Sequence, residues 1–189
     1  SAPEFTNNKF FDECKINYAE NCLTREDDDD SIIFHYEKKN KRNYSWRELR
    51  SAVFKFASYL KNNNIQKNDR IAAILPNIPE TVISFLSTAQ LGAIWSSCSS
   101  DFGKKAIIDR FKQIEPKVLL FSDYYFYNNK KVDTTKVIKD VIYNIPSIEK
   151  IILIPYEFNE TDYQLDFEYD NLYNILQQEI EYSLSLIHI

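Results

Sequence analysis

The chain has 189 residues and a net charge of −5. This length allows a domain with a buried core, and the acidic balance argues against a nucleic-acid-binding protein, which needs a basic face. Only two glycines occur, which excludes the glycine-rich phosphate loops G-x-G-x-x-G and G-x-x-x-x-G-K-[ST].

Several features bear on the compartment and on the ends of the chain. The three cysteines form no C-x-x-C pair and favour a reduced, cytoplasmic protein. No apolar run reaches the ~20 residues that span a bilayer, and residues 1–11 lack a signal-peptide pattern. The absence of methionine indicates a trimmed chain or an internal fragment. Residues 183–189, SLSLIHI, contain a run that one frame of a common sequencing-library adapter encodes, so we interpret them as an artefactual tail in which His188 has no function.

Residues 1–30 are predicted to be an extended lead-in, followed by an incomplete α/β subdomain over 31–182. The lead-in ends in an acidic run from Glu26 to Asp30. Contiguous carboxylates repel one another and lack the spacing of metal ligands, so the run is predicted to be a solvated loop and not a metal site.

The first elements of the subdomain are predicted to be two antiparallel strands. Residues 31–37, SIIFHYE, alternate in polarity, and the charged turn KKNKR separates them from Asn43-Tyr44. This pattern predicts a β-hairpin. His35 is then a packed or edge-exposed residue of the hairpin and not a ligand.

A helix and a strand follow the hairpin. Ser45 and Glu48 have the spacing of a capping box, which predicts a helix start. Apolar residues then recur at helical spacing and predict one buried face: Trp46, Leu49, Val53, Phe56 and Leu60. Residues 70–75, RIAAIL, form an apolar run typical of a strand covered on both faces.

Pro76 and Pro79 bracket the start of the next helix. Its predicted buried stripe consists of Ile78, Val82, Phe85, Leu86 and Ala89. The strand AIWSSC (93–98) then leads into small polar residues and Asp101-Phe102-Gly103. Small side chains directly after a parallel strand and ahead of a helix suit a phosphate-bearing ligand.

The second half continues the alternation of strands and helices. The predicted elements are a helix at 104–114, a strand at 118–121, a helix from Asp133 to Tyr143, a strand at 150–155, a loop at 156–170 and a helix at 170–180. Lysines in the first turn of helix 104–114 are unusual at a positive helix end unless an anion binds there. The alternation predicts an α/β fold with a mostly parallel sheet flanked by helices. Ligands of such sheets bind beyond the carboxyl ends of the strands, here at PNIPE, SSCSSDFG and SDYYFYNNKK.

Five segments in this order and spacing resemble the acyl-adenylate-forming synthetases, and within them the acetoacetyl-CoA synthetases. The segments are INYAEN (16–21), NDRIAAILPNIPE (68–80), LGAIWSSCSSDFG (91–103), DRFKQIEPKVLLFSD (109–123) and the aromatic run ahead of NNKKVD (128–133). The resemblance covers roughly residues 7–155. It implies the N-terminal subdomain of an acid–thiol ligase that uses ATP, coenzyme A and Mg.

In the reaction that the resemblance implies, a carboxylate, here acetoacetate, attacks the α-phosphorus of ATP, and the thiol of coenzyme A then displaces AMP. The family binds the pyrophosphate end of ATP with a Ser/Thr/Gly-rich loop ending in Lys, and it uses a lysine on a C-terminal lid. Neither occurs in this sequence. We therefore assign no catalytic residue and expect the chain by itself to be inactive.

The resemblance also implies two binding positions. In related enzymes the turn after the strand AIWSSC borders the coenzyme A channel, which here corresponds to Ser100, Asp101 and Phe102. An Arg-x-x-Arg stretch that contacts the nucleotide end of coenzyme A corresponds to 127–130, where Lys130 keeps a positive charge. Asn129 stands where this branch of the family has Gly, and Asn tolerates a left-handed backbone better than most residues.

Each of these residues also has a purely structural interpretation. The serine hydroxyls can satisfy backbone groups of a tight turn with Asp101 capping the next helix, and Lys130 can be a solvated surface charge. Arg110 can pair with Glu115 or Asp123, and Cys98 can be a small buried residue. The sequence offers no metal-ligand spacing and no nucleophile–base pair. For the whole protein, another short-chain (acetyl or propionyl) acyl-CoA synthetase and a non-catalytic module that binds a nucleotide or a partner remain as alternatives.

Overall fold

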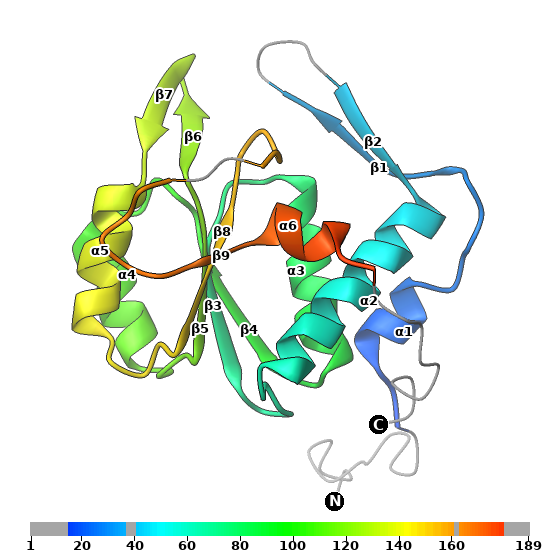
Figure 1. Ribbon diagram of the computed structural model, residues 1–189, viewed down its shortest axis with the longest axis horizontal. Helices are drawn as coiled ribbons and strands as arrows, with labels where there is room; N and C mark the ends of the chain where they lie inside the picture. Colours follow the sequence, from blue (N-terminus) through cyan, green and yellow to red (C-terminus); the bar gives the residue numbers. More distant parts are fainter. Residues whose placement is uncertain (1–14, 37–40, 161–162, 180–189) are drawn as a thin grey trace, which may run out of the picture.

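The computed structural model describes residues 15–36, 41–160 and 163–179. Its centre is a five-stranded parallel sheet in the order β4-β3-β5-β8-β9. The strands are β3 (Arg70–Ile74), β4 (Ile94–Cys98), β5 (Val118–Ser122), β8 (Lys150–Ile154) and β9 (Asp170–Asn171). Helices α2 (Trp46–Asn62) and α3 (Pro79–Gln90) cover one face, and α4 (Lys104–Lys112) and α5 (Thr135–Asn144) cover the other (Figure 1). The predicted α/β fold with a parallel sheet flanked by helices is confirmed.

Strand β3 shows why an apolar run forms the centre of the sheet. Its side chains alternate between the two faces, as in any strand. Ile71 and Ala73 belong to the core under α2 and α3, whereas Ala72 and Ile74 belong to the core under α4 and α5. All four are buried, as the sequence predicts.

The helix α2 begins at the predicted capping box. The Ser45 hydroxyl accepts a hydrogen bond from the Glu48 amide at 3.2 Å, and the Glu48 carboxylate accepts one from the Ser45 amide at 2.8 Å. Two backbone donors at the helix start are thereby satisfied. The predicted apolar face is buried, except that Trp46 is only half-buried.

The predicted buried stripe of α3 is wrong at Val82, whose side chain is 38% exposed. The buried face instead includes Ile83 and Ser87, and the Ser87 hydroxyl donates to the Val53 carbonyl of α2 at 3.0 Å. A close contact between two helices favours small side chains, so α3 presents its serines to α2 and turns Val82 toward solvent. The buried face of α3 therefore contains small polar residues, which a pattern of large apolar residues does not include.

The predicted lead-in 1–30 is not extended throughout its described part. Residues Tyr18–Cys22 form the short helix α1, because the Asn17 side chain accepts hydrogen bonds from the amides of Ala19 and Glu20. Asn17 also donates to the Gln90 carbonyl at 3.0 Å, which fixes α1 to the end of α3. The acidic run that follows forms exposed ion pairs with Arg25, Arg47 and Arg50.

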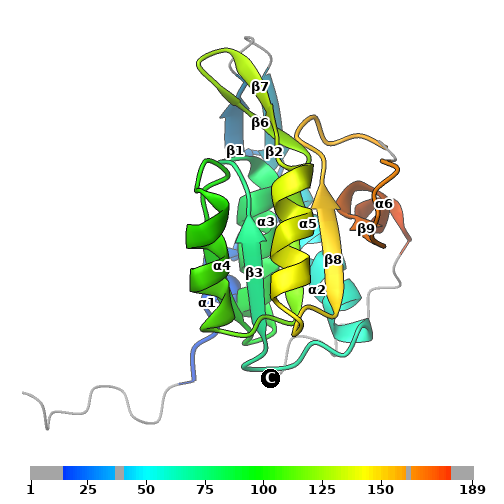
Figure 2. The ribbon, with the colours of Figure 1, turned by 90° about the vertical axis from the view of Figure 1, so that its left-hand side faces the viewer.

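Two antiparallel hairpins project beyond the carboxyl ends of the sheet strands (Figures 1 and 2). The predicted hairpin consists of β1 (Asp30–His35) and β2 (Lys41–Ser45). The second, β6 (Tyr124–Tyr127) and β7 (Lys130–Asp133), was not predicted. Its two-residue loop, Asn128-Asn129, has φ values of 49° and 60°, the positive values that a tight hairpin turn requires and that Asn tolerates.

The described chain ends in α6 (Leu172–Gln177), which is shorter than the predicted helix 170–180 because residues 170–171 form β9. The Asn171 side chain accepts from the Tyr173 amide at 2.9 Å and so marks the helix start. The predicted tail 183–189 lies outside the described residues.

Candidate functional site

The order of the strands determines where loops separate and leave space for a ligand. Numbered along the chain, the sheet order is 2-1-3-4-5, so successive connections run in opposite directions from β3. In such sheets a crevice lies outside the carboxyl ends of the strands at this switch point. Both hairpins stand at this end (Figure 2).

A cavity of about 310 Å³ lies at this end of the sheet. Segments that follow β3, β4, β5 and β8 line it together with β1. The lining residues are Phe34, His35, Pro76, Asn77, Ser99, Ser100, Asp101, Tyr125, Phe126, Tyr127 and Tyr156. All three predicted strand-end segments therefore contribute to one cavity, which has aromatic walls and a polar rim of serine, asparagine and aspartate.

The aromatic wall is held together by ring contacts between distant segments. The Tyr156 ring centroid lies 5.5 Å from that of Phe126 and 5.8 Å from that of Tyr36. Edge-to-face pairs of this kind fix ring orientation as well as burying area. The wall combines β1, β6 and the segment after β8, so its shape depends on all three.

Asp123 fixes the segments behind this wall. Its buried carboxylate accepts from the amides of Tyr124 and Tyr156, both at 2.9 Å, and from the Tyr163 hydroxyl at 2.6 Å. Burial, together with the hydrogen bond to Asp123, raises the pKa of Tyr163. Asp123 is thus used for these three links, whereas the sequence offered it as a partner for Arg110.

Ser100 carries the most informative polar group of the cavity. Its Oγ atom is buried and has no hydrogen-bond partner among the described residues. A buried hydroxyl normally finds a partner, so an unpaired one that lines a cavity fits a ligand that supplies the missing bond. The alternative, that this hydroxyl serves backbone groups of the turn, is wrong.

The four predicted binding residues are only partly brought together. Ser100 and Asp101 line the cavity, but Phe102 and Lys130 do not. Phe102 is 40% exposed, and the Arg110 guanidinium lies 5.5 Å from its ring centroid. Lys130 is exposed and pairs across the second hairpin with Tyr127, which does line the cavity.

The start of α4 also differs from the structural alternative in which Asp101 caps this helix. Its N-cap is Gly103, with no side-chain cap, so Asp101 does not cap the helix. Lys104 forms an ion pair with Asp140 of α5 at 2.7 Å. One lysine of the first turn therefore has a partner within the chain and does not require a bound anion. Cys98 is buried, as predicted, and burial raises the pKa of its thiol.

Sequence reasoning missed Phe34 and His35 as lining residues. They belong to β1 of the first hairpin, and no local sequence pattern predicts that this hairpin packs beside the carboxyl ends of the sheet strands. Tyr125 to Tyr127 were noted only as an aromatic run. The two asparagines between two short alternating segments are a signal that identifies this run as one strand of a hairpin.

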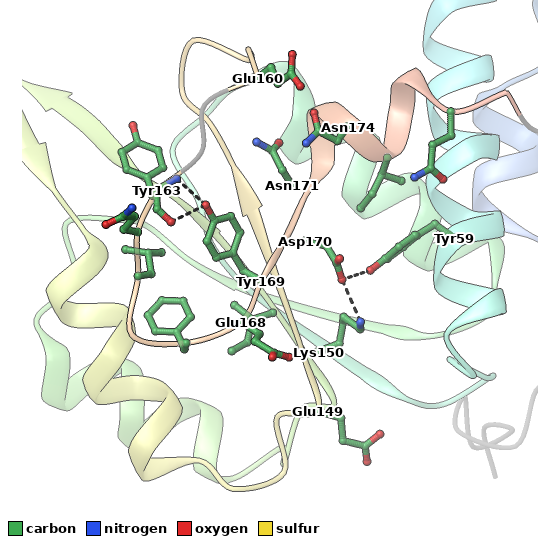
Figure 3. A pocket seen from close by; sticks show the side chains of 16 residues that line it. Tyr59, Glu149, Lys150, Glu160, Tyr163, Glu168, Tyr169, Asp170, Asn171 and Asn174 are labelled. Atoms are coloured by element: carbon green, nitrogen blue, oxygen red, sulfur yellow. Dashed lines mark hydrogen bonds and ion pairs between the residues drawn. The ribbon is translucent and has the colours of Figure 1, made fainter.

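A larger cavity of about 830 Å³ lies beside the outer edge of the sheet, between α2 and the segment that leads to β9 (Figure 3). Asp170 accepts from Tyr59, and its carboxylate lies 3.0 Å from the Lys150 ammonium. Burial, and next the hydrogen bond to Asp170, raise the pKa of Tyr59. These charged groups satisfy one another, so the network links α2 to β8 and β9 and does not indicate a ligand.

The described residues contain neither a metal-ligand cluster nor a membrane-spanning helix. No three His, Cys, Asp or Glu residues gather there as metal ligands. None of the helices described is long and apolar enough to cross a membrane.

Comparison with known proteins decides the family. The sequence model of the family described as AMP-binding enzyme matches residues 20–175. This range includes the whole sheet and every segment that lines the cavity. The chain belongs to the AMP-binding enzyme family.

Three similar proteins are named acetoacetyl-CoA synthetases. An acetoacetyl-coenzyme A synthetase of Rhizobium meliloti (strain 1021) is 40% identical over 148 residues, 78% of this chain and 22% of that protein. An acetoacetyl-CoA synthetase of Xenopus tropicalis is 35% identical over 150 residues, with the same coverage. The solved acetoacetyl-CoA synthetase of Streptomyces lividans superposes with a TM-score of 0.80 at 32% identity, over 88% of this chain and 26% of that structure. The chain thus spans about a fifth of the length of its curated relatives.

Proposed function

We propose that this chain is part of an ATP-dependent acid–thiol ligase that forms acetoacetyl-CoA through an acyl-adenylate, and that the cavity at the strand ends receives part of coenzyme A. The observation that supports coenzyme A binding is the buried Ser100 hydroxyl, which has no hydrogen-bond partner among the described residues. It lies at the position that the family resemblance relates to the coenzyme A channel. The names of the relatives support the assignment to an acid–thiol ligase.

The cavity residues fit a ligand with apolar, polar and anionic parts. Tyr125 and Tyr127 offer ring surfaces to a base or an apolar arm, and the Ser100 hydroxyl can donate or accept one hydrogen bond. Lys130, at the turn of the second hairpin, places a positive charge near the rim for phosphate groups. These groups bind and orient, and none of them is assigned to the chemistry.

ATP supplies the leaving group that activates the carboxylate, and Mg belongs to the same proposal by resemblance. The described residues of this chain offer no cluster of metal ligands, and the sequence has no Ser/Thr/Gly-rich phosphate loop. Its own contribution is therefore assigned to coenzyme A and not to ATP. The proposal also includes a cytoplasmic location, which the free thiols Cys22 and Cys98 support.

The test is to recover the coding sequence downstream of this chain and assay the complete protein with acetoacetate, acetate and propionate. We expect acetoacetate-dependent pyrophosphate exchange, and thioester formation when coenzyme A is added. A higher kcat/KM for acetate or propionate would move the protein to another short-chain acyl-CoA synthetase. A reading frame that continues without a Ser/Thr/Gly-rich loop ending in Lys, and no exchange with any acid, would refute the ligase and favour the non-catalytic module.

A further inference from the structure

A buried ion pair joins the first hairpin to the helix that starts beside the cavity. Glu80 lies in the first turn of α3 and is 0% exposed. Its carboxylate accepts from Arg42 Nη2 at 2.6 Å and from the Tyr44 hydroxyl at 2.8 Å. Both donors belong to β2, so one buried carboxylate connects this strand to α3.

The rest of the Arg42 guanidinium is enclosed by aromatic rings. Its central carbon lies 5.3–5.9 Å from four ring centroids, those of Phe34, Tyr36, Tyr44 and Phe158. Its Nε and Nη1 atoms are buried without a hydrogen-bond partner among the described residues. Ring faces attract a cation but accept no strong hydrogen bond, so Glu80 supplies the charge-assisted bond that holds Arg42 in place.

The same ion pair connects two walls of the cavity. Arg42 lies directly opposite Phe34 in the register of the hairpin, and Phe34 and His35 line the cavity. The loop that leads into α3 supplies Pro76 and Asn77 to the same cavity. A shift of β2 away from Glu80 would therefore move Phe34 away from the strand ends.

We propose that Glu80 is a positioning residue that, through Arg42 and Tyr44, holds the β1–β2 hairpin against the strand-end cavity and so completes the binding surface for coenzyme A. The identity of the ligand rests on the proposed function, whereas the attachment of the hairpin does not. Glu80 itself does not line the cavity. Without the attachment the hairpin is held in place for a smaller fraction of the time, and the apparent affinity falls by that fraction.

The test compares E80Q with D69N in the 189-residue chain. Gln keeps the shape of Glu80 but leaves the Arg42 guanidinium without a counter-charge. Asp69 immediately precedes β3 and pairs with Lys117 at 2.9 Å, at the end of the sheet away from the cavity. D69N is the matched control, because it breaks a partly buried ion pair without touching the hairpin.

Two measurements are made on each variant: hydrogen exchange of backbone amides, and calorimetric titration with coenzyme A. In E80Q we expect the amides of β1 and β2 to lose most of their protection from exchange while those of β5 are unchanged, since local opening is independent of the core. If the hairpin is held for about a tenth of the time, the Kd for coenzyme A rises roughly tenfold. D69N should lower overall stability but leave both the hairpin exchange and the Kd within about twofold of wild type, because its pair lies outside both structures.

The outcomes separate the two hypotheses. Unchanged hairpin exchange in E80Q, or equal changes in E80Q and D69N, would overturn the positioning role. Absence of coenzyme A binding by the wild-type chain would instead refute the assignment of the cavity, and hairpin exchange alone then decides the role of Glu80. Should E80Q fail to fold, R42K replaces it, because Lys keeps the charge but lacks the planar group that both Glu80 and the rings contact.

Discussion

At the scale of single residues, the cavity is marked by the buried Ser100 hydroxyl, which lacks a hydrogen-bond partner among the described residues. We predict that the Ser100 hydroxyl forms a hydrogen bond only when a ligand is bound. S100A should leave the free energy of unfolding unchanged or slightly increased, because no hydrogen bond in the chain is lost. The affinity for coenzyme A should fall by about 1 kcal/mol, measured by calorimetry. Ser84 also has a buried, unpaired hydroxyl but lies in α3 and does not line the cavity, so S84A is the control and should bind normally. Equal affinities of S100A and wild type would contradict the assignment.

Lys130 makes a prediction for the complete protein. If its ammonium contacts the phosphates of coenzyme A, K130A should raise the KM for coenzyme A by an equivalent of about 1–3 kcal/mol. ATP-dependent adenylation should remain nearly unchanged, because coenzyme A enters only in the second step. The control is K112A, which removes an exposed charge in the last turn of α4 and should change neither the KM for coenzyme A nor the rate of adenylation. A KM for coenzyme A that does not change in K130A would return Lys130 to the class of solvated surface lysines.

Asp69 predicts a pH dependence of stability. Burial opposes its ionisation, but the Gln66 amide and the Lys117 ammonium outweigh burial and hold the pKa of this carboxyl below its ordinary value of 3.8. Because the folded chain binds the proton more weakly than the unfolded chain, the stabilisation is present above about pH 4 and is lost as the pH falls through the lowered value. Urea unfolding should show D69N less stable than wild type by about 1–3 kcal/mol at pH 7, with the difference shrinking toward pH 3. A constant difference over this range would contradict the ionised Asp69.

At the scale of elements, the β6–β7 hairpin depends on its two-residue loop. Asn129 has a φ of 60°, and a β-branched residue there is strained by about 1–2 kcal/mol. N129V should therefore speed amide exchange in β6 and β7 and weaken coenzyme A binding, whereas N129G should preserve both, because glycine adopts positive φ readily. If N129V and N129G behave alike, this turn does not control the hairpin.

At the scale of the whole molecule, the chain provides a parallel sheet with a cavity at its carboxyl end. Phosphoryl chemistry depends on preorganised charge around the phosphates. The sequence contains no Ser/Thr/Gly-rich loop ending in Lys. The purified 189-residue chain should therefore show no acetoacetate-dependent pyrophosphate exchange, with the complete protein as the positive control. Robust exchange by the chain alone would refute this expectation.

The sequence by itself determined the elements that local chemistry controls. The capping box of Ser45 and Glu48, the buried run of β3 and the α/β alternation follow from hydrogen bonding and periodicity within a few residues. The resemblance located the turn that contains Ser100 and Asp101, although Phe102 and Lys130 lie outside the cavity lining. Errors occurred where a helix contacts a neighbour, as at Val82, and where a short helix or hairpin depends on asparagine, as at Asn17 and Asn128-Asn129.

Only the tertiary structure decided which residues face the cavity and which charges are buried. Phe34 and His35 reach the sheet end because β2 is attached to α3 through the ion pair of Arg42 with Glu80, residues 38 positions apart. The energy of such a contact depends on burial and on the neighbours that exclude water, which no local pattern specifies. Local chemistry therefore determines the sheet strands and the turn after β4, whereas the packing of two hairpins beyond the strand ends forms the cavity.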